Sequence, residues 1–159
     1  MITREVLTIK VLATINRTHN LRKALTSILK DVSYDKVSST NGGYFLDGSV
    51  DLSGIDGEVK VYYRKVPART ELPYLTYFLE HRKSENAYSY DFEVHIWSKD
   101  VKDAEEIADC IECIDNCIYS DEIQSFDIAL ERRLNVDDEN KEIQHIVLNF
   151  EIEYYNKKG

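Results

Sequence analysis

The clearest pattern in the chain is a helical one between Ser98 and Ser120. Apolar residues recur there every three or four positions, and carboxylates fill most positions between them. The apolar positions are Ile107, Ala108, Cys110, Ile111, Ile114, Cys117 and Ile118. Ser98 and Asp100 both suit an N-cap, and Asp103 puts a carboxylate in the first turn, where the helix dipole favours it. The pattern predicts one long amphipathic helix over about 99–119.

Alternating apolar and polar residues on both sides of this helix predict strands with one buried face. The expected strands cover residues 58–66, 72–80, 88–97, 123–134 and 143–155. The short polar connections between most of them favour an antiparallel meander. An amphipathic helix among such strands is buried most simply by lying across their sheet. We therefore expect an α+β fold, with a mostly antiparallel sheet of about five strands covered by the long helix and by N-terminal helices.

The N-terminal third is less regular. Residues 3–31 predict one or two helices, of which the one from Asn20 has the better apolar stripe, whereas alternation over 7–15 could also form a strand. Residues 33–57 carry most of the glycines and predict a loop, with room for a short hairpin through 44–52. These glycines fit no phosphate-binding motif, so nucleotide binding is not expected.

Length and composition point to one domain. A chain of 159 residues is long enough for one real core, and the apolar fraction of 43% with 31% charged residues is that of a soluble protein. We expect one domain over 1–159, with a helical segment at 3–31, a loop at 33–57 and a core of sheet and helix at 58–156. No apolar run approaches the roughly 20 residues of a membrane span. The polar N-terminus lacks the apolar region of a secretory signal, so the cytosol is the default location.

The net charge argues against binding to nucleic acid. Twenty basic residues against 29 acidic ones give a formal charge of −9. The phosphate backbone is held chiefly by Lys and Arg, so this surface should on average repel DNA. Such repulsion would suit a protein that lets DNA pass without holding it.

The three cysteines lie close together, as C-x2-C-x3-C at Cys110, Cys113 and Cys117. On a helix this spacing places all three thiols on the apolar face, where cysteine behaves as a small buried hydrophobe. The motif lacks a fourth cysteine, a nearby histidine and a turn that could wrap an ion. We expect a structural role, with a thiol or metal enzyme as a minor alternative and no metal or other cofactor.

Other residues give no enzyme signature. His95 and His145 fall on strand faces opposite the apolar registers, and neither has a sequence neighbour that makes a nucleophile or metal pair. Adjacent carboxylates such as Asp137 and Asp138 belong to solvated turns. Tyrosine is unusually frequent, with eleven residues, and most of these fit half-buried strand positions. The remaining interpretation of the tyrosines is a protein–protein interface.

Three segments, in order, carry a family resemblance: VYYRKVPARTELPYLTYFLE, FEVHIWSKDVKDAEEIADCIE and HIVLNFEIEYY. Over about 20–156 the chain resembles the tail terminator, or tail-completion, proteins of long-tailed bacteriophages and prophages, which join tail to head. The shared sequence motifs are the YR-x-VP turn ending at Pro67, LPYLTY at 72–77 and IWS ending at Ser98. The long loop at 33–57 and the first ~20 residues depart from shorter members.

The resemblance implies a structural virion protein without catalytic activity. Such a protein forms a ring, typically a hexamer, on the tail tube, ends tube polymerisation and meets the head connector, while DNA passes without specific binding. Its place would be the tail-neck region of the virion, after assembly in the bacterial cytoplasm, with no membrane contact. The alternative is a cytosolic dimeric module, binding a small molecule or regulating another protein, which predicts a concave apolar pocket lined by tyrosines.

Polar turns are the segments free to make assembly contacts. The candidate contact residues are Arg82 and Lys83 in the turn 81–87, and Asp137, Asp138 and Glu139 in the turn 135–142.

Overall fold

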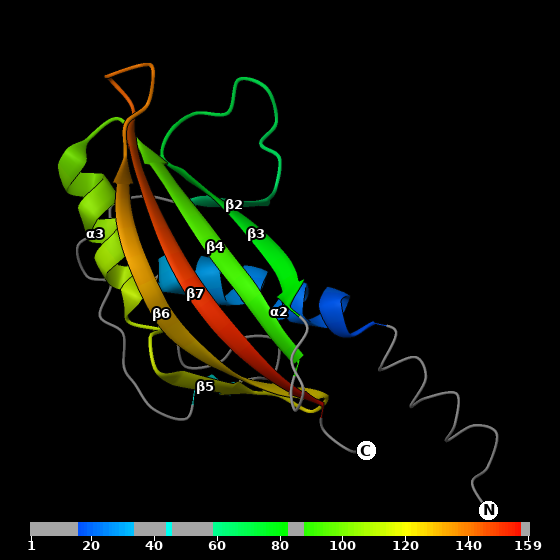
Figure 1. The fold of residues 1–159 in the computed structure, drawn as a ribbon. Coiled ribbons are helices and arrows are strands. Elements are labelled where there is room, and N and C mark those ends of the chain that lie inside the picture. Colours follow the sequence, from blue (N-terminus) through cyan, green and yellow to red (C-terminus); the bar gives the residue numbers. More distant parts are fainter. Residues whose placement is uncertain (1–15, 34–43, 46–58, 83–87, 157–159) are drawn as a thin grey trace, which may run out of the picture.

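The computed structural model describes residues 16–33, 44–45, 59–82 and 88–156 (Figure 1). Two helices and seven strands lie in these ranges. In chain order they are α2 (Arg17–Ser33), β1 (Tyr44–Phe45), β2 (Lys60–Tyr63), β3 (Tyr74–Arg82), β4 (Tyr88–Ser98), α3 (Val101–Glu112), β5 (Cys117–Ser120), β6 (Gln124–Val136) and β7 (Gln144–Asn156). The first predicted helix and most of the loop at 33–57 lie outside the described residues.

The described chain is mostly β, which corrects the expected fold class. The strands form one curled sheet in the order β1-β5-β6-β7-β4-β3-β2, a half-barrel in shape (Figure 1). The sheet is mixed, because β2 runs parallel to β3 while the other neighbours are antiparallel. Two short helices, α2 and α3, pack on this sheet, whereas the sequence predicted a long helix across a sheet of about five strands. The prediction of an antiparallel meander is thus wrong at β2. The segment between Tyr63 and Tyr74 is not a hairpin turn, because it connects two parallel strands.

The long helix predicted over 99–119 ends early. Asp100 is its N-cap, as the sequence suggests, and its carboxylate accepts a hydrogen bond from the backbone N–H of Lys102. Helix α3 stops at Glu112, and Asn116 adopts a left-handed φ of 60° before the chain enters β5. Asn tolerates that conformation better than most residues, so it reverses the chain here. The apolar residues that seemed to extend the stripe instead alternate in a strand, where Cys117 is buried and Ile118 is exposed.

The other strand predictions are confirmed in outline. Strands β4, β6 and β7 match their predicted ranges closely, β3 is shifted by two residues, and β2 is shorter than the predicted 58–66. Helix α2 begins at Arg17, three residues before the predicted start. Of the possible hairpin through 44–52, only β1 is described, and it pairs with β5.

One apolar core joins both helices to one face of the sheet. Helix α2 contributes Leu21, Leu25 and Ile28, which are fully buried, and α3 contributes Ile107 and Ile111. They pack on alternate residues of the central strands. These are Tyr77 and Leu79 of β3, Tyr90, Phe92, Val94 and Ile96 of β4, and Ile146, Leu148, Phe150 and Ile152 of β7. The period-2 pattern therefore identified the buried face correctly.

A β-bulge in β6 changes which residues face the helices. The pairing with β7 shifts between Leu130 and Arg132, which leaves Glu131 as the extra residue. The backbone N–H of Leu130 donates to the Asp115 carboxylate at 2.7 Å, so the chain that follows α3 supports the bulge. Because a bulge reverses the facing of every later residue, Arg133 turns toward the helices and Leu134 toward the opposite face.

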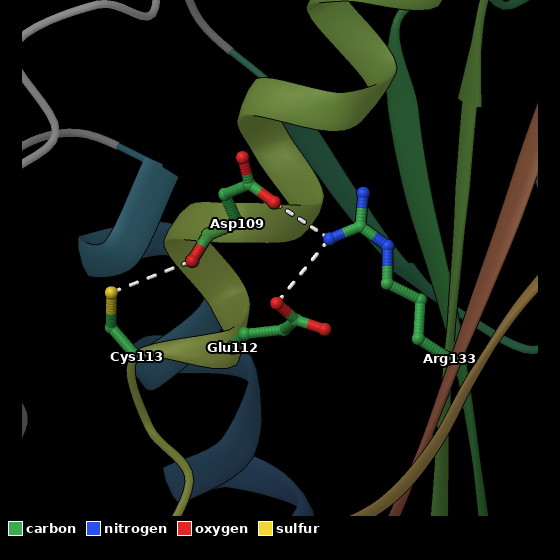
Figure 2. Close-up of polar contacts among 4 residues, drawn as sticks. All are labelled: Asp109, Glu112, Cys113 and Arg133. Carbon is green, nitrogen blue, oxygen red and sulfur yellow. Dashed lines mark hydrogen bonds and ion pairs between the residues drawn. The ribbon is translucent and has the colours of Figure 1, made fainter.

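Arg133 joins the far half of β6 to α3 (Figure 2). Its guanidinium donates to the carboxylates of Asp109 at 2.6 Å and Glu112 at 3.3 Å. The Arg133 side chain is 27% exposed, so water screens these pairs only in part. Cys113, at the end of the helix, donates its thiol to the Asp109 carbonyl oxygen.

Replacing Arg133 by glutamine is expected to lower the free energy of unfolding by about 1–2 kcal/mol, because two charge-assisted hydrogen bonds are lost in a partly screened setting. Urea unfolding would measure this. Arg132→Gln is the matched control, because Arg132 lies on the opposite side of the same strand. Equal losses in the two variants would contradict the role given to Arg133.

The cysteines are not buried together as predicted. Cys117 is buried and Cys110 is partly buried against the core, but Cys113 is exposed, and none of the three forms a disulfide. The prediction failed at Cys113, because α3 ends at Glu112 and its buried residues are Ala104, Ile107, Ala108 and Ile111. Burial, followed by the Glu112 and Asp109 carboxylates, raises the pKa of Cys113, which disfavours the reactive thiolate. Among the described residues, no group of three or more His, Cys, Asp or Glu is arranged to hold a metal ion.

Candidate assembly surface

The two faces of the sheet differ in what covers them. Both helices pack on the inner face, and α2 crosses behind the sheet in Figure 1. The opposite face, here called the outer face, is covered by neither of these helices. It carries the odd-numbered residues of β4 from Ser89 to Trp97 and the residues paired with them in β3 and β7. A broad uncovered sheet face is the first place to look for function, because it exposes side chains in fixed positions.

Aromatic and aliphatic side chains gather on one half of the outer face. We call Tyr74, Phe78, Trp97, Leu134 and Val136 the outer patch. The Tyr74 and Trp97 rings lie 6.3 Å apart, and Leu134 and Val136 are 38% and 39% exposed. The bulge places these two β6 residues here, opposite Val147 and His145 of β7. The residues of the outer patch therefore come from β3, β4 and β6, with β7 lying between β4 and β6.

A chain of polar side chains runs beside the outer patch. Nε2 of His95 lies 2.5 Å from a Glu93 carboxylate oxygen, and its Nδ1 lies 2.6 Å from Nε2 of His145. The two imidazoles share one proton on that line, because two N–H groups cannot point at one another. Trp97 stacks on His145 with ring centroids 3.6 Å apart. The cluster fixes the position of Trp97 across β4 and β7.

His145 is held in its neutral form. It is only 9% exposed. Burial, followed by the His95 imidazole, lowers the pKa of His145 from 6.5 to about 4, against the opposing pull of Asp138 and Glu93. The hydroxyl of Thr76 beside them accepts a hydrogen bond from the indole N–H of Trp97, so these side chains together hold the Trp97 ring in place. The cluster therefore resembles a structural support for the outer patch more than a catalytic relay.

The other half of the outer face is acidic. It carries seven carboxylates and two guanidinium groups. The carboxylates are Glu80, Asp91, Glu93, Asp127, Glu131, Glu151 and Glu153, and the guanidinium groups are Arg82 and Arg132. A hydrogen bond with Glu131 raises the pKa of Glu151, and burial together with Glu153 raises the pKa of Asp127. Like charges are thus crowded here without enough cations to balance them.

A hollow of about 470 Å³ lies within this acidic half. Glu80, Arg82, Glu131 and Arg132 line it together with Phe78. The alternative of a small-molecule module predicts an apolar pocket lined by tyrosines. This hollow does not match that description, because charged groups dominate its lining.

The predicted contact residues do not form one site. Arg82 lies at the end of β3, opposite Ser89, and pairs with Asp91 at 2.9 Å. Asp137, Asp138 and Glu139 lie in the turn between β6 and β7, at the other end of these strands (Figure 1). Lys83 lies outside the described residues. Asp138 is nevertheless close enough to His145 to act on its pKa.

Sequence reasoning missed the outer patch and the histidine pair. His95 and His145 were correctly assigned to the face opposite the apolar register, but they are 50 residues apart in the chain. Only the register of β4 against β7 brings them together. The β6 residues of the outer patch were missed because the bulge at Glu131 carries no glycine or other clear signal.

Comparisons with known proteins identify no family. No family model and no curated protein matches the chain. Among solved structures, a component of the virion of a native gene transfer agent particle is similar, with 14% identity, 70% of this chain and 87% of that chain covered, and a TM-score of 0.47. A second solved structure has 9% identity, covers 64% of this chain and 83% of that one, and has a TM-score of 0.48. With TM-scores below 0.5, neither likeness supports an argument about fold or function.

The described helices include none long and apolar enough to cross a membrane.

Proposed function

We propose that this chain is a structural virion protein that forms a ring on the tail tube of a long-tailed phage or prophage, ends tube polymerisation and joins the tail to the head connector. The observation that carries the proposal is the outer face. It presents an aromatic and aliphatic patch beside an unbalanced acidic surface, on the face of the sheet that neither described helix covers. Such a surface suits binding to another protein better than catalysis.

Two further points support the proposal. The ordered resemblance of three segments to tail terminator proteins names this role. A ring also needs heterologous contacts, in which one surface of a subunit meets a different surface of the next. The chain offers different surfaces at its two sheet ends, with β2 at one and β1 beside β5 at the other.

The dimeric small-molecule module remains the competing proposal. It needs an enclosed apolar pocket, and the charged hollow on the outer face offers it no support. A stable dimer that shows no ring on tail tubes would favour this competitor.

Replacing Leu134 and Val136 together by lysine is expected to weaken binding to tail tubes strongly, because two charges would enter the apolar part of the contact. Co-sedimentation with purified tubes measures the effect, and binding should fall at least ten-fold. The matched control is the double variant Val101→Lys and Ile123→Lys, since these residues are also exposed and apolar but lie outside the outer patch. Unchanged tube binding by the Leu134 and Val136 variant, while folded, would contradict a role for this patch.

A further inference from the structure

The chain carries opposite charges on two different surfaces. In addition to the acidic outer face, the chain has a basic edge where α2 meets β2 and the turn that follows β2. We define the basic edge as Arg22, Arg64, Lys65 and Arg69. The guanidinium carbons of Arg22 and Arg64 lie 5.0 and 5.4 Å from the centre of the Tyr63 ring, which joins the helix to the strand.

The basic edge is largely exposed, and the described residues give it no matching carboxylates. Arg64, Lys65 and Arg69 are all exposed. Between residues 59 and 73 the chain has one acidic residue, Glu71. No ion pair joins the four cations of the basic edge to a carboxylate within the described residues. A surface that strongly positive is unusual on a chain whose net charge is −9.

From this complementarity we propose that the acidic outer face of one copy binds the basic edge of the next copy, head to tail. The proposal rests on the ring of the proposed function and names the two surfaces that would build it.

A second copy fits the outer face better than the other possible occupants. DNA would be repelled by the excess of carboxylates. Two outer faces meeting around a two-fold axis would place crowded carboxylates against one another, which is costly. Contact between the outer face and the basic edge neutralises both surfaces. Because the two surfaces differ, the contact is heterologous, and repeating it produces a ring or an open chain but not a closed dimer.

The raised pKa values on the outer face agree with this arrangement. The pKa of Glu151 is raised first by its hydrogen bond with Glu131, and the pKa of Asp127 is raised first by burial and then by the Glu153 carboxylate, so carboxylates crowd both groups. Cations from a second copy would relieve that crowding.

Reversing charges on each surface tests the pairing. The face variant is Glu80→Lys with Glu131→Lys, and the edge variant is Lys65→Glu with Arg69→Glu. Sedimentation of the full chain at about 50 mM salt would measure the Kd of self-association, since the electrostatic contribution is large at low ionic strength. Each variant alone is expected to weaken association at least ten-fold. An equimolar mixture of the two should restore it to within about three-fold of the original chain, because every contact in an alternating assembly is again complementary.

Matched controls separate this contact from net charge. Glu105→Lys with Glu122→Lys changes the net charge as the face variant does, and Lys99→Glu with Lys102→Glu changes it as the edge variant does. These four residues are exposed and lie off both surfaces. Both controls are expected to associate within about three-fold of the original chain.

Three outcomes would overturn the inference. They are a chain that stays monomeric at low salt, variants that behave like their controls, and folded variants that fail to associate when mixed. None of these decides the proposed function, which depends on ring formation on tail tubes and could use other surfaces. Conversely, head-to-tail association that never caps a tube would support the pairing and contradict the function.

Discussion

Acidification from about pH 6.5 to 4 is expected to destabilise the folded chain by about 3 kcal/mol through His145, at 1.36 kcal/mol for each pKa unit. Folding lowers the pKa of His145 from 6.5 to about 4, chiefly by burial. Above pH 6.5 the group is neutral in both states and the contribution of neutral His145 is fully present. As the pH falls, the unfolded chain takes up a proton that the folded chain resists, so stability is lost progressively until about pH 4.

Urea unfolding at pH 7 and at pH 4.5 measures this effect. The exposed carboxylates titrate in the same range, so the comparison is between the original chain and His145→Gln, which should lose less stability on acidification. His81→Gln is the control, because His81 is exposed on the same sheet. An equal fall in stability for His145→Gln and the original chain would contradict the assignment. The fluorescence of Trp97, the one tryptophan in the chain, should also change over this range because its ring lies on His145.

Replacing Tyr77 by alanine is expected to lower the free energy of unfolding by about 3–5 kcal/mol, because it would leave a cavity where α2 meets the sheet. Tyr77 is fully buried, and its ring contacts Phe92 and Tyr63. Its hydroxyl donates to the Arg22 carbonyl oxygen at 3.0 Å and lies 2.5 Å from the Thr26 hydroxyl. Burial raises the pKa of Tyr77 to about 12, so the hydroxyl stays protonated.

Tyr77→Phe separates the hydroxyl from the ring. It keeps the packing but removes the hydrogen bonds to α2, so a loss of about 1–2 kcal/mol is expected. Thermal or urea unfolding measures both variants. Tyr62→Phe is the control, because Tyr62 faces away from α2 on the neighbouring strand. Loss of stability by less than about 1 kcal/mol in Tyr77→Ala would contradict the central place of this residue.

The sequence predicted the buried face of the sheet better than it predicted the sheet itself. Alternation in 88–97 and 143–155 identified the core residues of β4 and β7, because side-chain direction in a strand has a strict period of two. The extent of α3 was overestimated, because Ile114, Cys117 and Ile118 fit a helical stripe by chance while Asn116 ends it. The parallel pairing of β2 was missed, because an alternating segment does not encode the direction of its neighbour.

The outer patch and the pair of histidines beside it could not be predicted from the sequence for a different reason. They depend on contacts between distant residues, such as His95 with His145, and on a bulge that turns Leu134 outward. The predicted contact residues were selected because they lie in polar turns. Turns are exposed, but exposure alone does not bring Arg82 near Asp137.

The measurement that tests the central claim most directly is the mass of the purified chain across concentration, with and without tail tubes, together with negative-stain images of the same samples. We predict a ring of about six subunits with a central opening, either free or at one end of each tube. A chain that remains a monomer or a closed dimer in both settings, and leaves the tube ends bare, would contradict the assignment to tail termination.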